Sequence, residues 1–305
     1  MPKRYQNLDE VGTNKTLVEI WKCLRERWSK SKDLSIHIPR ADERNVEELK
    51  KNRTKTSYTW IGHSSFLLQM KGLNILTDPV FAKYLGFSKR LISPGLSIDE
   101  LPEIDIVVIS HGHYDHLEFS TLRRLKGEPT YYVPAGLNLL FQKKGLHRVE
   151  EANWWDTFQH QDLTIHFVPA QHWTRRSLFD TNTSHWGGWV LESDEETNYF
   201  VGDTGYFRGF QEIGKKFTLD TVFMPIGSYE PEWFTYASHI NPEDAVKAFV
   251  ELQAKTFVPM HYGTYRLADD TGPEALARLL HEWKRCQLPE HQLFVMKVGE
   301  TVFKR

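Results

Sequence analysis

The chain carries the stretch Ser110-His111-Gly112-His113-Tyr114-Asp115-His116 directly after the apolar run Ile104–Ile109. Three imidazoles and one carboxylate therefore lie within six residues of one another. An apolar core cannot satisfy all of these polar atoms, and an exposed loop gains nothing from concentrating them. Imidazole nitrogens and carboxylate oxygens are the ligands that zinc takes at about 2.0–2.2 Å, four to a site. The stretch predicts a metal site at the end of a strand.

A single ion rarely takes four ligands so close in sequence. The alternation predicts that His111 and His113 bind one ion, while Asp115 and His116 turn toward a second. Each ion then still lacks ligands, and other strand ends should supply them, because ligand sites gather at one end of such sheets. The sequence has three residues in such positions, each just past an apolar run: His172, Asp203 and His261.

From about residue 56 the chain alternates short apolar runs with Gly, Pro and Asp, which is typical of strands joined by turns. The predicted strands are 58–61, 65–70, 73–77, 104–110, 130–133, 163–168, 189–192, 199–201, 221–225, 256–260 and 293–297. The predicted helices are 120–126, 136–144, 242–254 and 273–286. This interleaving predicts an α/β or α+β sandwich with some antiparallel pairs. No linker divides residues 56–305, so we expect one main domain there.

Residues 1–55 are expected to form a helical extension packed on this main domain. Apolar side chains recur at three- and four-residue steps, which predicts an amphipathic helix. The apolar stripe consists of Leu17, Ile20, Trp21, Leu24 and Trp28. We expect the stripe to pack on the main domain; a lid or a membrane-facing helix is the alternative.

The composition describes a packed globular protein of 305 residues, with 40% hydrophobic and 26% charged residues, and so excludes disorder and coiled coil. A net charge of -2 gives no reason to expect a nucleic-acid partner. Residues 1–55 nevertheless carry 14 basic and 9 acidic residues, a net of +5, against 24 and 31 in the rest, a net of -7. We interpret the basic segment as a solvated face, with contact to an anionic surface such as lipid headgroups as the alternative.

The cysteines, the apolar runs and the first ten residues bear on the compartment of the protein. Cys23 and Cys286 form no disulfide framework, and no run of 18 apolar residues is present to span a bilayer. The first ten residues show no apolar segment typical of a signal peptide. We expect a cytoplasmic protein, and peripheral membrane contact is the further expectation.

Several other motifs accompany the His-rich stretch between residue 56 and the C-terminus. They are Trp60–Ser64, Thr77–Pro79, Pro169–Trp173, Trp186–Trp189, Gly202–Tyr206, Pro225–Phe234, Ser238–Glu243 and His261–Thr264. With the His-rich stretch, this set resembles the metallo-β-lactamase superfamily. Gly202–Tyr206 and Tyr229–Phe234 narrow the resemblance to the branch of N-acylphosphatidylethanolamine-hydrolysing phospholipases D and their bacterial relatives.

The resemblance implies a four-layer αβ/βα sandwich with two zinc ions at one edge. It assigns His111, His113 and His172 to the first ion and Asp115, His116 and His261 to the second, with Asp203 bridging the two. It also matches Tyr114 and His239 to positions that contact the substrate phosphate. A homodimer is a further implication.

The expected activity is that of a dizinc metallohydrolase acting on a phospholipid or small phosphodiester. Two cations about 3.5–4 Å apart clamp a hydroxide and polarise a phosphoryl oxygen. Asp115 and Asp203 would fix the hydroxide that attacks phosphorus, and His239 would donate a hydrogen bond to the substrate. The resemblance implies cleavage of N-acylphosphatidylethanolamine to an N-acylethanolamine and phosphatidic acid.

Other functions fit the same ligand set less well. A lactonase or other ester hydrolase is the alternative enzyme, and a nuclease is disfavoured by the net charge. A scaffold that holds metal without turnover is a poor explanation, because all seven ligand positions are filled. Iron or manganese are alternatives to zinc, since His and Asp bind all three metals.

Overall fold

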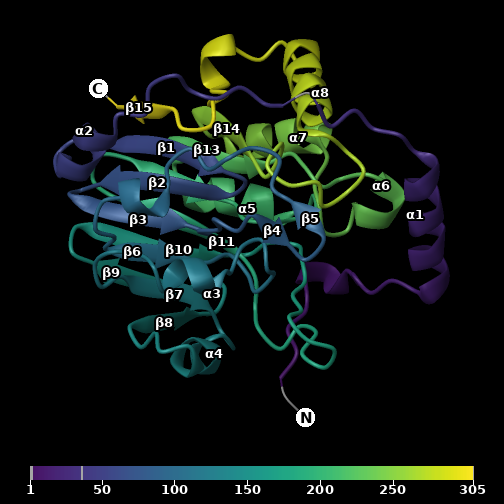
Figure 1. Cartoon of the computed structure of the whole chain (residues 1–305), viewed down its shortest axis with the longest axis horizontal. Coiled ribbons are helices and arrows are strands. Elements are labelled where there is room, and N and C mark those ends of the chain that lie inside the picture. Colours follow the sequence, from purple (N-terminus) through teal and green to yellow (C-terminus); the bar gives the residue numbers. More distant parts are fainter. Residues whose placement is uncertain (1–2, 36, 305) are drawn as a thin grey trace.

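Two β-sheets lie face to face in the computed structural model, which describes residues 3–35 and 37–304 (Figure 1). The first sheet has the strand order β15-β1-β2-β3-β6-β7-β8. Its strands are β1 (Ser57–Gly62), β2 (Ser65–Met70), β3 (Leu73–Thr77), β6 (Ile106–Val108), β7 (Thr130–Pro134), β8 (Val149–Ala152) and β15 (Thr301–Phe303). The pairs among β15, β1, β2 and β3 are antiparallel, and β3, β6, β7 and β8 run parallel.

The second sheet has the order β14-β13-β12-β11-β10-β9. Its strands are β9 (Thr157–His160), β10 (Leu163–Val168), β11 (Gly188–Glu192), β12 (Thr197–Phe200), β13 (Thr221–Pro225) and β14 (Thr256–Met260). β9 to β12 pair antiparallel, whereas β12, β13 and β14 run parallel. A short hairpin of β4 (Tyr84–Leu85) and β5 (Ser88–Lys89) stands apart from both sheets.

Alternation along the strands sends side chains to two separate cores. In β2, Phe66 and Leu68 face the second sheet, and the ring of Phe66 lies 4.7 Å from that of Phe223 in β13. Leu67, between them, belongs to the other core, which lies on the outer face of the first sheet. The continuous apolar runs in the sequence therefore reflect strands that are buried on both faces.

Helices cover the outer face of each sheet, which gives four layers. The first sheet is covered by α2 (Val46–Lys51), α3 (Phe119–Leu122) and α4 (Asn138–Lys143), and the second by α5 (Gly209–Lys216), α7 (Pro242–Leu252) and α8 (Gly272–Arg285). α7 begins at a cap in which the Asn241 side chain accepts a hydrogen bond from the Asp244 N–H, with Pro242 in the first turn. The expectation of an α/β sandwich is confirmed.

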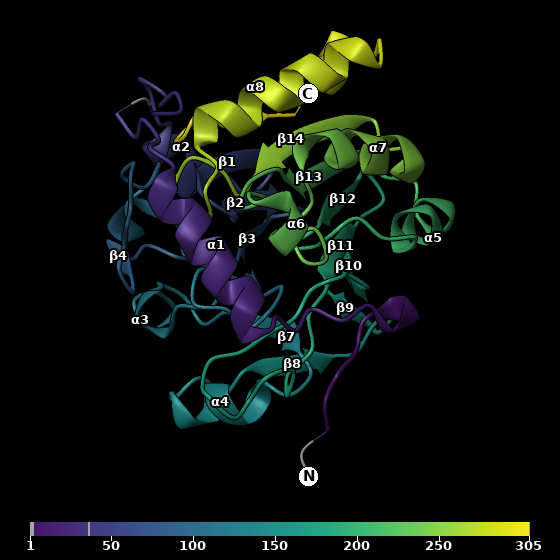
Figure 2. The same ribbon diagram turned by 90° about the vertical axis from the view of Figure 1, so that its right-hand side faces the viewer.

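The N-terminal segment contains η1 (Leu8–Glu10) and α1 (Leu17–Ser29), and α1 crosses one face of the molecule (Figure 2). The helix forms where its apolar periodicity predicts, but most of its apolar stripe does not pack on the main domain; only Ile20 lines the cavity shared with that domain. Trp28 is 86% exposed and Trp21 62%. The contacts come instead from polar side chains: Glu26 accepts a hydrogen bond from Trp233 Nε1 at 3.0 Å, and Arg27 pairs with the buried Asp269 at 3.4 Å. One hydrogen bond and one ion pair thus hold the helix with most of its apolar stripe exposed.

The predicted strand at residues 293–297 is wrong. Within this fully described segment, Leu293 makes only an isolated bridge to Phe257, and the chain then crosses to the first sheet to form β15. Because this segment passes from the edge of one sheet to the edge of the other, too few of its residues lie along either edge to form a ladder of backbone hydrogen bonds. The helix predicted at residues 120–126 is observed as α3, which is shorter than predicted and ends at Leu122. Across the described residues, no helix is long and apolar enough to cross a membrane.

Candidate metal centre

All seven predicted ligands emerge at the same edge of the sandwich. The stretch 110–116 follows β6, and His172, Asp203 and His261 follow β10, β12 and β14. These strands point the same way within their sheets, so their carboxyl ends meet at one edge. The side chains therefore lie where we expected them, each at the end of a strand on this edge.

His111, His113 and His172 form the first cluster. His111 Nε2 lies 2.9 Å from His113 Nδ1, and His172 Nε2 lies 3.2 Å from the same atom. Four ligands at about 2.0–2.2 Å from a tetrahedral ion lie about 3.3–3.6 Å apart. The three nitrogens are spaced closely enough to share one ion.

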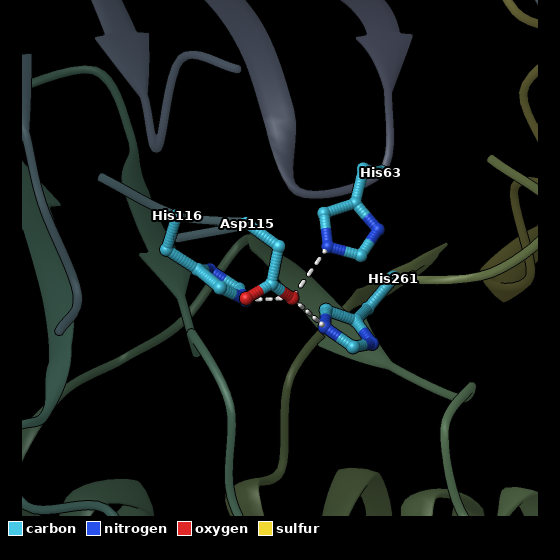
Figure 3. Close-up of side chains that lie close together, drawn as sticks. All are labelled: His63, Asp115, His116 and His261. Atoms are coloured by element: carbon cyan, nitrogen blue, oxygen red, sulfur yellow. Dashed lines mark hydrogen bonds and ion pairs between the residues drawn. The ribbon is translucent and has the colours of Figure 1, made fainter. Parts of the chain in front are cut away.

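Asp115, His116 and His261 form the second cluster, together with His63 from the turn between β1 and β2 (Figure 3). Asp115 Oδ2 lies 3.3 Å from His116 Nε2, 3.5 Å from His261 Nε2 and 3.1 Å from His63 Nε2. His63 thus contacts the carboxylate from the side opposite His116. The structure thus places His63, which is buried, against the carboxylate of a predicted ligand.

Asp203 lies between the two clusters. Its Oδ1 is 3.1 Å from His261 Nε2, and its Oδ2 is 3.3 Å from His116 Nε2 and 3.9 Å from His172 Nε2. One carboxylate therefore faces ligands of both clusters. This placement suits a residue that bridges two ions.

Unpaired buried atoms test whether these residues fit metal ions. Among the described residues, His116 Nε2, His261 Nε2 and Asp203 Oδ1 are buried and have no hydrogen-bond partner. Yet His261 Nε2 lies 3.1 Å from Asp203 Oδ1, and His116 Nε2 lies 3.3 Å from Asp203 Oδ2. Unsatisfied buried polar atoms are costly. Atoms that converge without hydrogen-bonding to one another are arranged as ligands around a cation, so the residues fit bound divalent metal.

The pKa values of the predicted histidine ligands differ between the two clusters. Burial lowers the pKa of His113 to about 4, and burial likewise holds the pKa of His111 and His172 well below the usual value. These imidazoles are neutral and can offer a lone pair to a metal. In the second cluster burial acts against charge on His261, but Asp203 and Asp115 outweigh it and raise its pKa to about 9. The carboxylates there hold positive charge in place, as they would hold a cation.

Asp78 is the anchor that sequence reasoning missed. It follows β3 and is fully buried; its Oδ1 accepts from the Ser110 N–H at 2.7 Å, and its Oδ2 lies 2.5 Å from Ser110 Oγ and 2.6 Å from His116 Nδ1. The bond to Nδ1 leaves His116 Nε2 facing the centre. A signal was present, because Asp78 directly follows an apolar run, as Asp203 does.

Other contacts fix the loops that carry the ligands. The Arg176 guanidinium donates to the carbonyls of Gly112 at 2.7 Å and Leu117 at 3.0 Å, so it braces the 110–116 loop from inside. His172 Nδ1 lies 2.8 Å from the Ser238 carbonyl oxygen.

The predicted substrate residues are placed differently from each other. His239 lies beside the ligands, with Nδ1 3.8 Å from Asp203 Oδ2, and lines the cavity over the metal centre. Tyr114 is 56% exposed, and its hydroxyl donates to the Arg176 carbonyl at 2.9 Å. The structure thus brings His239 to the centre and turns Tyr114 away from the cavity.

The cavity over the centre has a volume of about 630 Å³. His113, Asp115 and Asp203 form its floor. Its walls come from distant segments of the chain and include Thr13, Asn14, Lys15, Ile20, Trp173, Arg175, Phe234 and Leu267. The N-terminal segment therefore contributes to the same cavity as the metal ligands.

A family model described as "Beta-lactamase superfamily domain" matches residues 73–262, which include all seven predicted ligands. The chain belongs to the metallo-β-lactamase superfamily. Its solved relatives agree in fold: a metallo hydrolase of Ignicoccus hospitalis has a TM-score of 0.62 and 24% identity, covering 83% of this chain and 99% of that one. A possible metal-dependent hydrolase of Veillonella parvula has a TM-score of 0.68 and 19% identity, covering 82% and 100%.

Curated members of the superfamily are more similar in sequence. An N-acyl-phosphatidylethanolamine-hydrolyzing phospholipase D of Caenorhabditis elegans is 35% identical over 226 residues, 68% of this chain and 64% of the relative. The mitochondrial enzyme of that name from Saccharomyces cerevisiae is 34% identical over 275 residues, 84% and 58%. A metal-dependent hydrolase of Myxococcus xanthus is 32% identical over 239 residues, 73% and 76%. The chain spans less than two thirds of the two phospholipases, and all three names support the expected hydrolase class.

We expect Asp78→Asn to lower the metal affinity of the protein about 10- to 100-fold. The amide would set an N–H group against groups that now donate to the carboxylate, so His116 would lose its orientation. Competition with a chromophoric chelator measures the affinity. Asp99→Asn, at an exposed carboxylate in η2 (Ile98–Glu100), is the matched control. Equal affinities of the Asp78 variant and the parent would contradict the anchoring role.

Proposed function

We propose that the protein is a dinuclear metallohydrolase that cleaves N-acylphosphatidylethanolamine to an N-acylethanolamine and phosphatidic acid. The observation that carries the proposal is the pair of ligand clusters sharing Asp203 at the floor of a cavity with both cationic and apolar walls. The names of the two phospholipase relatives support the choice of substrate. Zinc is the proposed metal, because imidazole and carboxylate are its ordinary ligands.

The cavity walls suit a substrate with an anionic centre and apolar chains. Lys15 and Arg175 are cationic residues in the lining, and they complement the charge of a phosphodiester. Ile20, Trp173 and Phe234 supply apolar surface beside them. A lactonase is the alternative, but it would be expected to enclose its small substrate in a polar pocket.

Bound divalent ions would supply a water of lowered pKa and neutralise charge that develops on the phosphoryl oxygens. The protein's own residues place the reacting groups. Asp115 and Asp203 are held by imidazoles on either side and orient the attacking water toward phosphorus. The bond from phosphorus to the N-acylethanolamine oxygen breaks, and that oxygen takes a proton. His239, at the cavity wall, donates a hydrogen bond to the phosphate or to this leaving oxygen.

The face around the cavity carries exposed apolar side chains from three segments. Leu17 and Trp28 of α1 are each 86% exposed, Leu178 and Phe179 follow the cavity residue Arg175, and Phe87 lies at the β4–β5 turn. Ser88 of that turn donates to the Arg266 carbonyl, next to Leu267 of the cavity. Figure 2 shows α1 crossing the front of the molecule and β4 at the left edge of the same view.

Apolar tips interspersed with basic residues are typical of proteins that lie on anionic membranes. Lys15, Lys22 and Arg25 accompany the apolar stripe of α1. A membrane on this face would bring a lipid substrate to the cavity mouth without its leaving the bilayer. We therefore include peripheral contact with anionic lipid in the proposed function.

Incubation of zinc-loaded protein with N-acylphosphatidylethanolamine micelles tests the reaction. We expect mass spectrometry to find N-acylethanolamine and phosphatidic acid with the parent protein and neither product with Asp203→Asn. Asp203 faces both clusters, so its amide variant loses the shared carboxylate. Absence of both products, with two zinc ions confirmed bound, would overturn the phospholipase proposal, and opening of lactones by the same protein would favour the alternative.

His239→Ala should lower kcat about 10²- to 10⁴-fold, as expected when a proton or hydrogen-bond donor is removed from the reacting groups. Metal content, measured by mass spectrometry of the inorganic elements, should stay at the parent level. The distant His281→Ala serves as the matched control and should keep the parent turnover. Unchanged kcat in the His239 variant would exclude this role, and loss of metal would make His239 a ligand instead.

The double variant Trp21→Ser/Trp28→Ser should reduce binding to vesicles of anionic phospholipid about tenfold, because it removes apolar surface that enters the headgroup region. Co-sedimentation measures the binding. Val250→Ser/Leu280→Ser changes two exposed apolar side chains on α7 and α8 and should bind as the parent does. Equal loss in both double variants, or none in the first, would contradict a membrane-facing α1.

A further inference from the structure

Asn7 joins the N-terminal segment to the metal centre. Its side chain is only 8% exposed. The Oδ1 atom accepts a hydrogen bond from the backbone N–H of His172 at 2.9 Å and another from Trp186 Nε1 at 2.9 Å. The Nδ2 atom donates to the Val11 carbonyl at 3.0 Å. All the polar atoms of this buried amide are therefore in use.

The bond to His172 acts on a metal ligand. The His172 imidazole is held at Nδ1 by the Ser238 carbonyl oxygen, 2.8 Å away, which directs Nε2 toward His113. The bond from Asn7 holds the same residue at its backbone. Two fixed points, one on the backbone and one on the ring, define where Nε2 lies. Without Asn7 the buried N–H would lack an acceptor, and the loop would move to find one.

Residues 4–11, which we term the N-terminal arm, are fixed along the loop that follows His172. The Tyr5 N–H donates to the Asn182 carbonyl at 2.9 Å, and the Tyr5 ring stacks on His185 with centroids 4.3 Å apart. Arg4 donates to the carbonyls of Phe179 and Thr181. These contacts keep Asn7 in place, so the arm is built into this side of the site.

We propose that Asn7 is a positioning residue of the metal centre, which acts through the His172 backbone to fix the ion bound by His111, His113 and His172. The N-terminal arm is then part of the hydrolytic site although it precedes the segment that matches the family model. The proposal rests on the metal centre of the proposed function and is independent of the identity of the substrate.

The two bonds accepted by Asn7 can be separated by mutation. Asn7→Ala removes both. Asn7→Asp retains an oxygen acceptor for both, but it adds a buried charge and turns its second oxygen toward the Val11 carbonyl, which costs stability. Trp186→Phe removes the indole donor and leaves the bond to His172. A purely structural role of Asn7 would make all three variants less stable without changing metal affinity, whereas a positioning role separates affinity from stability.

Chelator competition with Zn²⁺ at both sites measures the effect. We expect Asn7→Ala to lower the affinity for one of the two zinc ions about 10- to 100-fold and to leave the affinity for the other unchanged, because only His172 loses its support. Asn7→Asp and Trp186→Phe should bind both ions as the parent does. The visible spectrum of the Co²⁺-loaded protein should change in Asn7→Ala and remain unchanged in Trp186→Phe, since it reports the geometry of the ligands.

Parent-like affinity for both ions in Asn7→Ala would overturn the proposal, as would equal weakening of metal binding in Trp186→Phe. If Asn7→Ala does not fold, Asn7→Gln takes its place, because it keeps the amide and displaces the oxygen by one methylene group; the same outcomes then apply. Failure of the lipid assay would leave these affinities unaffected. Parent-like affinities would equally leave the hydrolase proposal intact.

Discussion

The hydrogen bonds of one buried carboxylate, Asp78, hold the site together. Asp78 stands at the end of β3 and receives hydrogen bonds from the Ser110 backbone and hydroxyl, at the end of the neighbouring parallel strand β6. The same carboxylate orients His116. The start of the ligand loop and the direction of an imidazole therefore depend on one side chain. A charge without these partners would be too costly to bury there.

The order of the strands extends this constraint to the rest of the centre. β10, β12 and β14 end at the same edge as β6, so ligands far apart in sequence meet without long loops. Residues that brace the loops come from still other places: Arg176 from the segment after His172, and Asn7 from the N-terminal arm. Residues that are not predicted ligands thus hold the ligand loops in place.

The sequence predicted the sandwich and the positions of the ligands because both are local patterns: apolar runs, and a His or Asp just past their ends. The role of Asp78 could not be read in this way, since it depends on which imidazole lies opposite. Asn7 gave no signal at all, being a single amide 165 positions from the residue it contacts. The α1 stripe was assigned to the interior because periodicity shows which side chains share a face. It does not show which face the hydrogen bond of Glu26 and the ion pair of Arg27 will hold against the main domain.

The predicted ligands come from both sheets, which would give bound metal a thermodynamic role in the whole fold. His111, His113, Asp115 and His116 belong to the first sheet, and His172, Asp203 and His261 to the second. An unfolded chain would not hold these groups together, so ions bound to the native state add to the free energy of unfolding by mass action, by about 2.7 kcal/mol per site at a free concentration 100 times the dissociation constant. The supply of such metal would therefore set the stability of the fold as well as the activity of the site.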